Sequence, residues 1–279
     1  MDAVLLLNKP AGMTSFDAVS RCRRILHEKK VGHTGTLDPN ASGLMILLFG
    51  KYTKFLPYCV KDHKQYVAGF RFGIDTDTQD IWGTVIAEKE PAFHSPEEVR
   101  SAAESFLGSG TQIPPMYSAV KINGRKLYEL ARKGQTVERA PRPVTIDRMD
   151  VSCDGPDWKL SATVSGGTYI RTLIHDLGER LGEYAVMTSL VRTGIESLSV
   201  SEACTLEDLE TSPSFVPVER VLDPSIPCME AADYESVIHG RVIRMEHDAP
   251  LILFQKDGQV LAAYAKREDG LYHCQRGLL

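Results

Sequence analysis

The amino-acid sequence predicts an α+β fold that ends in a small β-rich domain. Apolar runs of strand length alternate with helical patterns over most of the chain, and only short β patterns follow Asp223-Pro224. At 279 residues the chain is long enough for one large domain and a small one, and 43% hydrophobic with 25% charged residues is a globular composition. We place the larger domain at residues 1–222 and the smaller one at residues 223–279.

The first elements are a strand and a capped helix. Residues 4–7 form a short apolar run, which predicts a strand. Thr14 and Asp17 have the spacing of a capping box, so a helix is expected to begin there, with Lys9 on the turn between strand and helix. The apolar face expected for this helix consists of Phe16, Val19 and Leu26.

The middle of the chain predicts two further strands and a second helix. Residues 44–49 are wholly apolar, as in a strand buried at the centre of a sheet, and residues 66–72 follow as a strand bounded by polar turns. Ser95-Pro96-Glu97-Glu98 combines an N-cap, a proline at the first helical position and a glutamate at the third. Leu107-Gly108 is expected to end this helix.

A third helix and the last β patterns complete the prediction. Strands at residues 144–153 and 158–164 lead into Ser165-Gly166-Gly167, a glycine turn that opens the helix. Arg171 lies in its first turn, where the helix dipole disfavours a cation, so we expect an anionic partner for it. A turn-rich stretch then spans residues 196–225. The apolar stripe expected for the helix consists of Ile170, Leu173, Ile174, Leu177 and Leu181. Short β patterns are expected at residues 242–245, 251–254 and 260–265.

Charge is distributed unevenly along a chain whose net charge is −5. Residues 121–148 carry eight Lys and Arg against three acids, and a second basic cluster lies within residues 21–30. Residues 202–279 hold fourteen acids against seven Lys and Arg, so the negative balance lies in the tail. Although the net charge argues against an RNA partner, two basic stretches on either side of one loop predict an electrostatic footprint for a nucleic acid.

The sequence predicts neither a metal nor a cofactor. The six cysteines are scattered without a Cys-x-x-Cys pair, which argues against zinc and against a disulfide framework. No phosphate-loop motif is present, and Asp75-Thr76-Asp77-Thr78-Gln79-Asp80 lacks the glycine and the final acid of a calcium loop. Because no apolar run reaches the roughly 18 residues of a membrane span and the first residues lack a basic signal-peptide start, we expect a cytoplasmic protein without a membrane partner.

The most informative segment surrounds Asp38. This carboxylate precedes Pro39, which favours an extended backbone, and the glycines Gly32, Gly35 and Gly43 lie nearby. Gly35 is expected to adopt dihedral angles that other residues avoid. Asp-Pro alone is a common turn dipeptide, but in this setting it predicts a tight loop that holds the carboxylate at a cleft.

Several blocks of the sequence, in a fixed order over residues 4–195, form a larger pattern. They are Asn8-Lys9-Pro10-Ala11-Gly12-Met13-Thr14-Ser15, Gly32-His33-Thr34-Gly35-Thr36-Leu37-Asp38-Pro39, Gly50-Lys51-Tyr52-Thr53-Lys54, Lys64-Gln65-Tyr66, Thr76-Asp77-Thr78-Gln79-Asp80, Pro114-Pro115-Met116-Tyr117-Ser118-Ala119-Val120-Lys121 and Gly166-Gly167-Thr168-Tyr169-Ile170-Arg171-Thr172. The pattern resembles the TruB family of tRNA pseudouridine synthases. In that family the aspartate of the Gly-Thr-Leu-Asp-Pro motif, here Asp38, is the catalytic residue.

The resemblance implies a fold, an activity and a partner. The fold would be the pseudouridine synthase fold, a mixed and mainly antiparallel sheet flanked by helices with a central catalytic cleft, followed by a PUA-like RNA-binding domain. The activity would be an intramolecular transfer, an isomerisation of the T-loop uridine at position 55 of tRNA to pseudouridine. The partner would be the T arm of tRNA, bound by a monomer without a guide RNA, and residues 121–142 would be a mobile insertion that closes over it.

The resemblance also assigns roles within the site. Tyr66 would stack on the target uracil and stand near C5 for a late proton transfer, and Leu190 would form an apolar wall for the base. His33 would occupy the space left by the everted nucleotide, because a uridine in a folded loop must be extruded before it can react. Tyr169 would contact the nucleotide or pack below it, and Lys9 would support the pocket near Tyr66.

The reaction explains why a carboxylate and an arginine suffice. The C1′–N1 bond breaks, the base turns within the site and C1′ joins C5, so no redox change or external group is needed. Asp38 either attacks as a nucleophile or removes the C2′ proton to form a glycal, and both routes require it to be ionised. Because burial raises the pKa of a carboxyl group, we expect the Arg171 guanidinium to compensate by pairing with Asp38.

Two other functions are compatible with the same fold. One is a non-catalytic tRNA-binding or RNA-folding protein, against which the intact set of Asp38, Tyr66 and Arg171 argues. The other is a relative that works within a guide-RNA particle. Such a protein is expected to carry a longer basic tail, whereas this chain ends in an acidic module, so the sequence favours a stand-alone enzyme.

Overall fold

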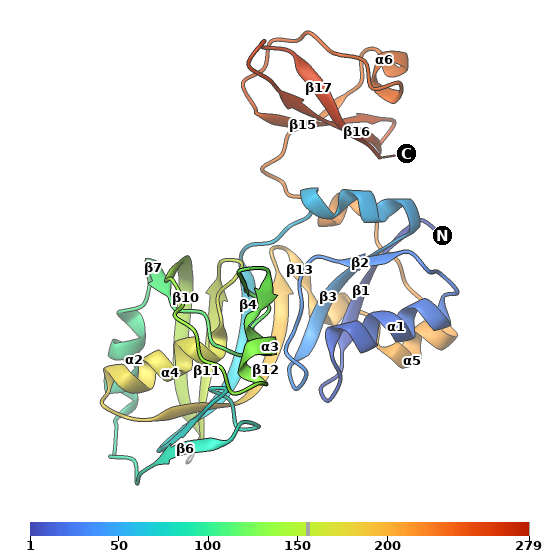
Figure 1. Cartoon of the computed structure of the whole chain (residues 1–279). Helices are drawn as coiled ribbons and strands as arrows, with labels where there is room; N and C mark the ends of the chain where they lie inside the picture. Colours follow the sequence, from blue (N-terminus) through green and yellow to red (C-terminus); the bar gives the residue numbers. More distant parts are fainter. Residues whose placement is uncertain (155–156, 279) are drawn as a thin grey trace. The chain divides into compact units, whose positions relative to one another are not determined.

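A computed structural model describes residues 1–154 and 157–278 (Figure 1). Contacts between residues divide the chain into two compact units that exchange segments. The first unit comprises Met1–Pro39, Gly43–Lys61 and Leu198–Leu279, and the second comprises Asn40–Ser42 and Asp62–Ser197. This division joins the C-terminal residues to the N-terminal ones, and the domain boundary at residues 222 and 223 stays a prediction.

Three strands near the N-terminus of the first unit pair with one another. They are β1 (Ala3–Lys9), β2 (Val31–His33) and β3 (Ser42–Phe49). Both β1 and β2 pair with β3 in the antiparallel sense, so β3 lies between them at its Phe49 end. Every residue from 44 to 49 is completely buried, which confirms the predicted central strand.

Helix α1 (Ser15–Ile25) begins at the predicted capping box, with Thr14 as the N-cap and Asp17 completing it. The prediction for its apolar face is wrong at Phe16, which is 68% exposed. The helix instead buries Ser15, Ala18, Val19 and Cys22, which follow the i, i+3, i+4, i+7 spacing of one face, and Phe16 projects away from that face. The polar Ser15 is therefore a core residue of this unit.

Short helices complete the first unit before its C-terminal sheet. They are η1 (Gly50–Tyr58), η2 (Val200–Glu202), α5 (Leu206–Thr211) and η3 (Val218–Val221), beside the two-residue strand β13 (Leu198–Ser199). The stretch from residue 196 to 225 is thus rich in turns, as predicted, although it also contains α5.

A four-stranded sheet follows, in the order β14 (Cys228–Glu230), β15 (Leu251–Lys256), β16 (Gln259–Lys266) and β17 (Tyr272–Gly277), with the short helix α6 (Tyr234–Ile238). The predicted strand at residues 242–245 is wrong, because only Ile243 makes a bridge, to Tyr272. Sequence reasoning missed β14 and β17. The rings of Phe254 and Tyr264 meet edge to face at 5.2 Å in the core of this part, which confirms a small C-terminal β domain.

The second unit is built on a larger antiparallel sheet. Its order is β12 (Ala185–Ile195), β4 (Lys64–Phe72), β11 (Asp157–Val164), β10 (Arg142–Asp154) and β7 (Gly108–Gln112). Helices α2 (Pro96–Glu104) and α4 (Ile170–Arg180) lie along this sheet, α2 against β10 and α4 against β12 (Figure 1). A mainly antiparallel sheet flanked by helices is therefore confirmed.

Helix α2 starts as predicted and ends earlier. Ser95 and Glu98 form a capping box, and Pro96 occupies the first helical position. The helix ends at Glu104, not at Leu107-Gly108, because Gly108 (φ 90°) is already the first residue of β7. The prediction is wrong here because a glycine that starts a strand has the same local signature as one that ends a helix.

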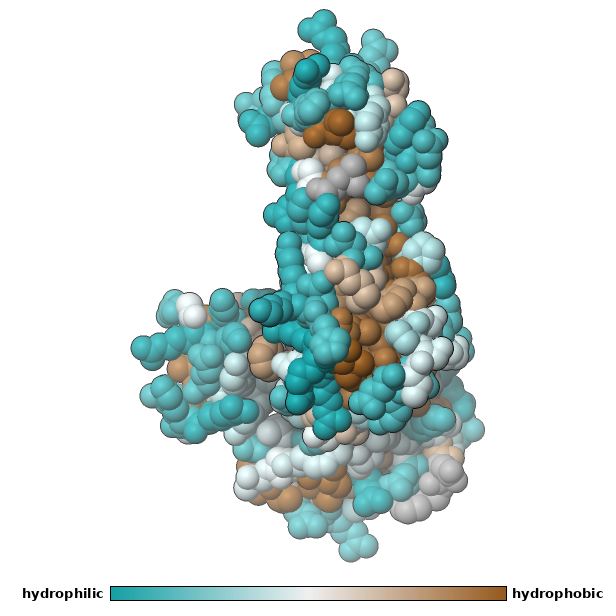
Figure 2. Space-filling view, turned by 90° about the vertical axis from the view of Figure 1, so that its right-hand side faces the viewer, coloured by the Kyte–Doolittle hydropathy of each residue, from teal (hydrophilic) through white to brown (hydrophobic). Residues whose placement is uncertain are grey.

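Two hairpins extend from the second unit. Strands β5 (Ile74–Thr76) and β6 (Val85–Glu88) form the first. Strands β8 (Lys121–Ile122) and β9 (Arg125–Lys126) form the second, which continues into α3 (Leu127–Ala131) and lies within the predicted insertion. No helix in the described part of the chain is long and apolar enough to cross a membrane. Figure 2 shows one face of the surface, where hydrophilic residues surround smaller hydrophobic patches.

Candidate active site

Asp38 lies in an irregular, half-buried loop between β2 and β3. Its preceding neighbour, Leu37, is fixed by Ser15 at the start of α1. The Ser15 Oγ donates a hydrogen bond to the Leu37 carbonyl at 2.9 Å and accepts one from the Leu37 N–H at 2.8 Å. Both backbone groups of Leu37 bond to one buried hydroxyl. The backbone that leads into Asp38, the residue with the candidate carboxylate, is therefore held in place.

The residue after Asp38 is fixed from the other side by Lys9. Lys9 is fully buried as the last residue of β1, and its Nζ donates to the carbonyls of Pro10, Met13 and Pro39 at 2.8, 2.8 and 3.2 Å. The Gly12 N–H also donates to the Pro39 carbonyl, at 3.0 Å. Lys9 thus belongs to the strand and not to the turn, and it positions the Asp38 loop; its predicted contribution to substrate binding stays a prediction.

The glycines of the loop act differently from the expectation. The glycine with positive φ is Gly43 (φ 109°), while Gly35 is not among the residues in that conformation. Gly32 packs closely, because a Cβ there would lie 2.4 Å from Leu56 Cδ1 and the leucine side chain would have to shift. The loop is therefore held by hydrogen bonds and close packing more than by unusual dihedral angles.

His33 is the last residue of β2, where it pairs with Leu47 of β3, and it is half-buried. Together with Lys9 and Asp38 it belongs to the first unit. The other predicted site residues belong to the second unit. The predicted role of His33, to fill the space that the everted nucleotide leaves, stays a prediction.

Tyr66 and Leu190 lie on one face of the sheet of the second unit. Tyr66 on β4 is directly opposite Arg192 on β12, and Leu190 is directly opposite Ala68. Directly opposite residues of an antiparallel pair project to the same side, and so do residues two apart on one strand. Both Tyr66 and Leu190 are 8% exposed. The structure therefore brings these two predicted residues to a common surface.

The same face carries two cations that sequence reasoning missed, Lys64 and Arg192. Arg192 is 1% exposed, and Lys64 is two residues before Tyr66 on β4. Burial, followed by the positive charge of Arg192, lowers the pKa of Lys64 to about 8, and Asp62 opposes the shift. Lys64 could have been found from the sequence, because it stands two residues before Tyr66 and would share its face of a strand. No local pattern indicates Arg192.

Tyr169 is fixed by a glutamine that the sequence did not single out. The Gln112 Oε1 accepts a hydrogen bond from the Tyr169 N–H at 2.8 Å, and the Gln112 Nε2 donates to the Tyr169 carbonyl at 3.1 Å. Gln112 is buried, and Tyr169 is the N-cap residue of α4. Tyr169 also lines a hollow of about 370 Å³ together with Val120, Arg142, Pro143, Gly166 and Gly167.

Arg171 connects three of the sequence blocks. Its Nη1 donates to the Thr78 carbonyl at 3.1 Å and its Nη2 to the Tyr117 carbonyl at 2.6 Å, while Asp80 Oδ2 lies 3.8 Å from Nη1. Its guanidinium also lies 5.8 Å from the centre of the Tyr169 ring. Arg171 is 3% exposed, and its two hydrogen bonds hold the Thr78 and Tyr117 segments beside the start of α4. Its predicted pairing with Asp38 stays a prediction.

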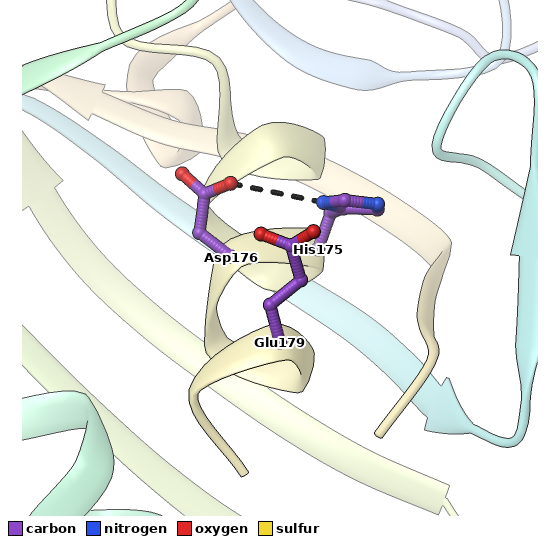
Figure 3. Close-up of side chains that lie close together, drawn as sticks. All are labelled: His175, Asp176 and Glu179. Atoms are coloured by element: carbon purple, nitrogen blue, oxygen red, sulfur yellow. Dashed lines mark ion pairs between the residues drawn. The ribbon is translucent and has the colours of Figure 1, made fainter. Parts of the chain in front are cut away.

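Figure 3 shows a separate group of ionisable side chains on α4, His175, Asp176 and Glu179. The Nδ1 of His175 lies 3.7 Å from Asp176 Oδ1, and its Nε2 lies 3.6 Å from Asp75 Oδ1. The interaction with Asp176 raises the pKa of His175, Asp75 and Glu179 add to the rise, and partial burial opposes it. Exposed acids of this kind are common without a bound ion, so we assign the group a role in stability.

Replacing His175 by glutamine is expected to destabilise the protein more at about pH 5.5 than at about pH 8. The raised pKa means that folding favours protonated His175, so its contribution is complete below the unfolded value of about 6.5 and is lost as the pH rises through the folded value. Melting temperatures of wild type and variant at both pH values measure this. His239→Gln, at an exposed histidine also paired with an acid, is the matched control. An equal destabilisation at both pH values would contradict the assignment.

Comparison with known proteins identifies the class to which this fold and site belong. Residues 23–170 match the family model described as TruB family pseudouridylate synthase (N terminal domain). Residues 171–232 match the model described as tRNA pseudouridylate synthase B C-terminal domain. The protein is thus a pseudouridylate synthase by class, an enzyme of the isomerase type.

Curated relatives and solved structures agree with these models. The chain is 43% identical to the tRNA pseudouridine synthase B of Burkholderia mallei over 88% of its own length and 83% of the relative's. It is 37% identical to the protein of the same name from Oenococcus oeni, over 100% of its own length and 98% of the relative's. The chain belongs to the TruB family. A chain of a Cbf5-Nop10-Gar1 complex shares the fold, with a TM-score of 0.76 and 23% identity over 99% of this chain and 85% of that one.

Proposed function

We propose that this protein isomerises the T-loop uridine of tRNA, at position 55, to pseudouridine, with Asp38 as the catalytic carboxylate. One observation carries the assignment to Asp38: the residues on both sides of it are anchored by buried side chains, Leu37 by Ser15 and Pro39 by Lys9. A fixed carboxylate in a loop is what attack at a ribose carbon requires, because orientation supplies much of the rate. Membership of the TruB family and the name of its relatives support the tRNA substrate.

The other site residues are assigned by what surrounds them. Tyr66 and Leu190 share one buried face of the sheet, which suits an aromatic surface and an apolar wall for an everted uracil. Tyr169, fixed by Gln112 at the start of α4, contacts the nucleotide, and His33 fills the space that the base leaves. Arg171 stabilises the loops around the site and supplies positive charge for Asp38. Whether Asp38 attacks C1′ or removes the C2′ proton is left open.

Binding of the tRNA is expected to depend on the basic stretch at residues 121–148. Its hairpin, β8 and β9, presents exposed lysine and arginine side chains that suit phosphate contacts. We propose that residues 121–142 close over the T arm and that the enzyme acts as a monomer without a guide RNA. The similarity to chains from Cbf5 complexes extends only to the fold.

One experiment separates the enzyme from a non-catalytic RNA-binding protein. Purified protein is incubated with an unmodified tRNA transcript, without any other RNA, and pseudouridine is mapped along the product. Product at position 55 alone supports the proposal, and a transcript with cytidine at that position is the matched control. Binding without product would support a tRNA-folding function, and product only after addition of a guide RNA would indicate a particle subunit.

A further inference from the structure

Lys64, Tyr66 and Arg192 lie on one face of the second unit's sheet, and the proposed function uses only Tyr66 of the three. Lys64 and Tyr66 are two residues apart on β4, and Arg192 is directly opposite Tyr66 on β12. The residues opposite Lys64 on the adjoining strands are Val164 and Ile195, which are apolar. A lysine and an arginine therefore flank the tyrosine assigned to the uracil, over an otherwise apolar floor.

The Lys64 ammonium lacks a strong partner within the described residues. The charged groups that act on it are Arg192, which disfavours its protonated form, and the carboxylate of Asp62, which favours it. Burial also disfavours the charged form, so the pKa of Lys64 falls to about 8. The positive charge of Arg192 disfavours the protonated form of Lys64, and an anion bound beside the Lys64 ammonium would favour it.

The proposed reaction generates such an anion beside Tyr66. When the C1′–N1 bond breaks, its electron pair stays with the uracil and spreads over N1, O2 and O4. Asp38 loses its negative charge in the same step, either by forming an ester with C1′ or by taking the C2′ proton. In both routes one negative charge therefore moves from the carboxylate to the base, and no electron or proton leaves the site.

We propose that Lys64 is a further catalytic residue, whose ammonium group stabilises the departing uracil as an anion, with Arg192 beside it. This inference rests on the proposed function. The position favours the base over a backbone phosphate, because the side chain stands on the partly buried sheet face that carries Tyr66 and Leu190, the residues assigned to the uracil. A fixed cation placed where negative charge develops acts on the transition state more than on the bound substrate.

Two substitutions test this assignment, Lys64→Met, which keeps the length of the side chain, and Lys64→Arg, which keeps its charge. The rate of a single turnover at saturating tRNA is expected to fall about 100-fold in Lys64→Met, with a Kd for tRNA within about threefold of wild type. Lys64→Arg is expected to retain much more of the rate. Equal melting temperatures of the three proteins would exclude misfolding as the cause.

The pH dependence gives a readout that a merely structural role would not change. In the wild type, kcat/KM is expected to fall above a pH of about 8, where Lys64 loses its proton. Lys64→Arg is expected to lack this fall, because a guanidinium stays protonated. Asp62 and Arg192, the other charged groups that act on position 64, are the same in the wild type and in Lys64→Arg.

Three results would overturn the inference. Full single-turnover rate in Lys64→Met would exclude a role in the reaction. A weaker Kd with a salt dependence reduced by about one phosphate contact, at an unchanged rate, would assign Lys64 to the RNA backbone. If the wild type formed no pseudouridine, the proposed function itself would be wrong. If the wild type formed pseudouridine and Lys64→Met formed it at the same rate, only the inference about Lys64 would be wrong.

Discussion

Replacing Asp38 by asparagine is expected to abolish pseudouridine formation and to leave the tRNA Kd within about tenfold of wild type. Asparagine keeps the shape of the side chain, and the bonds that hold the loop come from Ser15 and Lys9 to the backbone of Leu37 and Pro39, so they survive the change. An amide neither attacks C1′ nor accepts the C2′ proton. Single-turnover assays and filter binding with the same transcript measure the two quantities.

The matched control is Asp248→Asn, the same chemical change at a fully exposed aspartate outside the predicted site. It is expected to leave both rate and affinity unchanged. If Asp38→Asn retained turnover, Asp38 would be removed from the mechanism. If it lost affinity by far more than tenfold, the carboxylate would instead be needed to bind or shape the RNA site.

Replacing Arg171 by alanine is expected to abolish most activity and also to lower the free energy of unfolding by about 3 kcal/mol. The guanidinium is 3% exposed and bonds to the carbonyls of Thr78 and Tyr117, so its removal leaves two partly buried acceptors without these donors. The loops that it joins lie 93 and 54 residues away from it in sequence. Denaturant unfolding monitored together with turnover measures both effects.

Arg180→Ala is the matched control, since Arg180 is an exposed arginine in the last turn of the same helix. It is expected to change stability and activity little. Arg171→Lys separates the two roles, because a lysine keeps the charge but cannot reach both carbonyls in a fork. Normal stability of Arg171→Ala would contradict the role assigned to these hydrogen bonds.

The elements that the sequence predicted are those with local signals. The two predicted capping boxes, at Thr14 and Ser95, start helices as expected, because a cap is formed within four residues. Strand β12 was missed. It pairs with β4 across more than a hundred residues, carries Thr188, Ser189 and Arg192 among its apolar residues, and has two register shifts, so its local pattern is irregular.

Residues of the candidate site were likewise predicted where their signal is local and missed where it is not. Asp38 was found because its motif is contiguous in the chain. Ser15 and Gln112 were not, since each acts on backbone groups 22 or 57 residues distant and neither differs locally from an ordinary polar residue. Buried polar side chains that serve another segment, as these two do, become visible only when the chain is folded.

The segment between β7 and β10 is closed at its base. Gln112 pairs with Arg142 in the sheet, and the Arg139 Nη1 donates to the Pro114 carbonyl at 3.0 Å. The same Gln112 fixes Tyr169 through both of its amide atoms. The chain therefore leaves the sheet after Gln112 and re-enters it at Arg142 at a fixed point, which Pro114 and Arg139 reinforce. A change of length or sequence between Tyr117 and Arg139 is therefore expected to leave the ends of this segment, and Tyr169 beside them, in place.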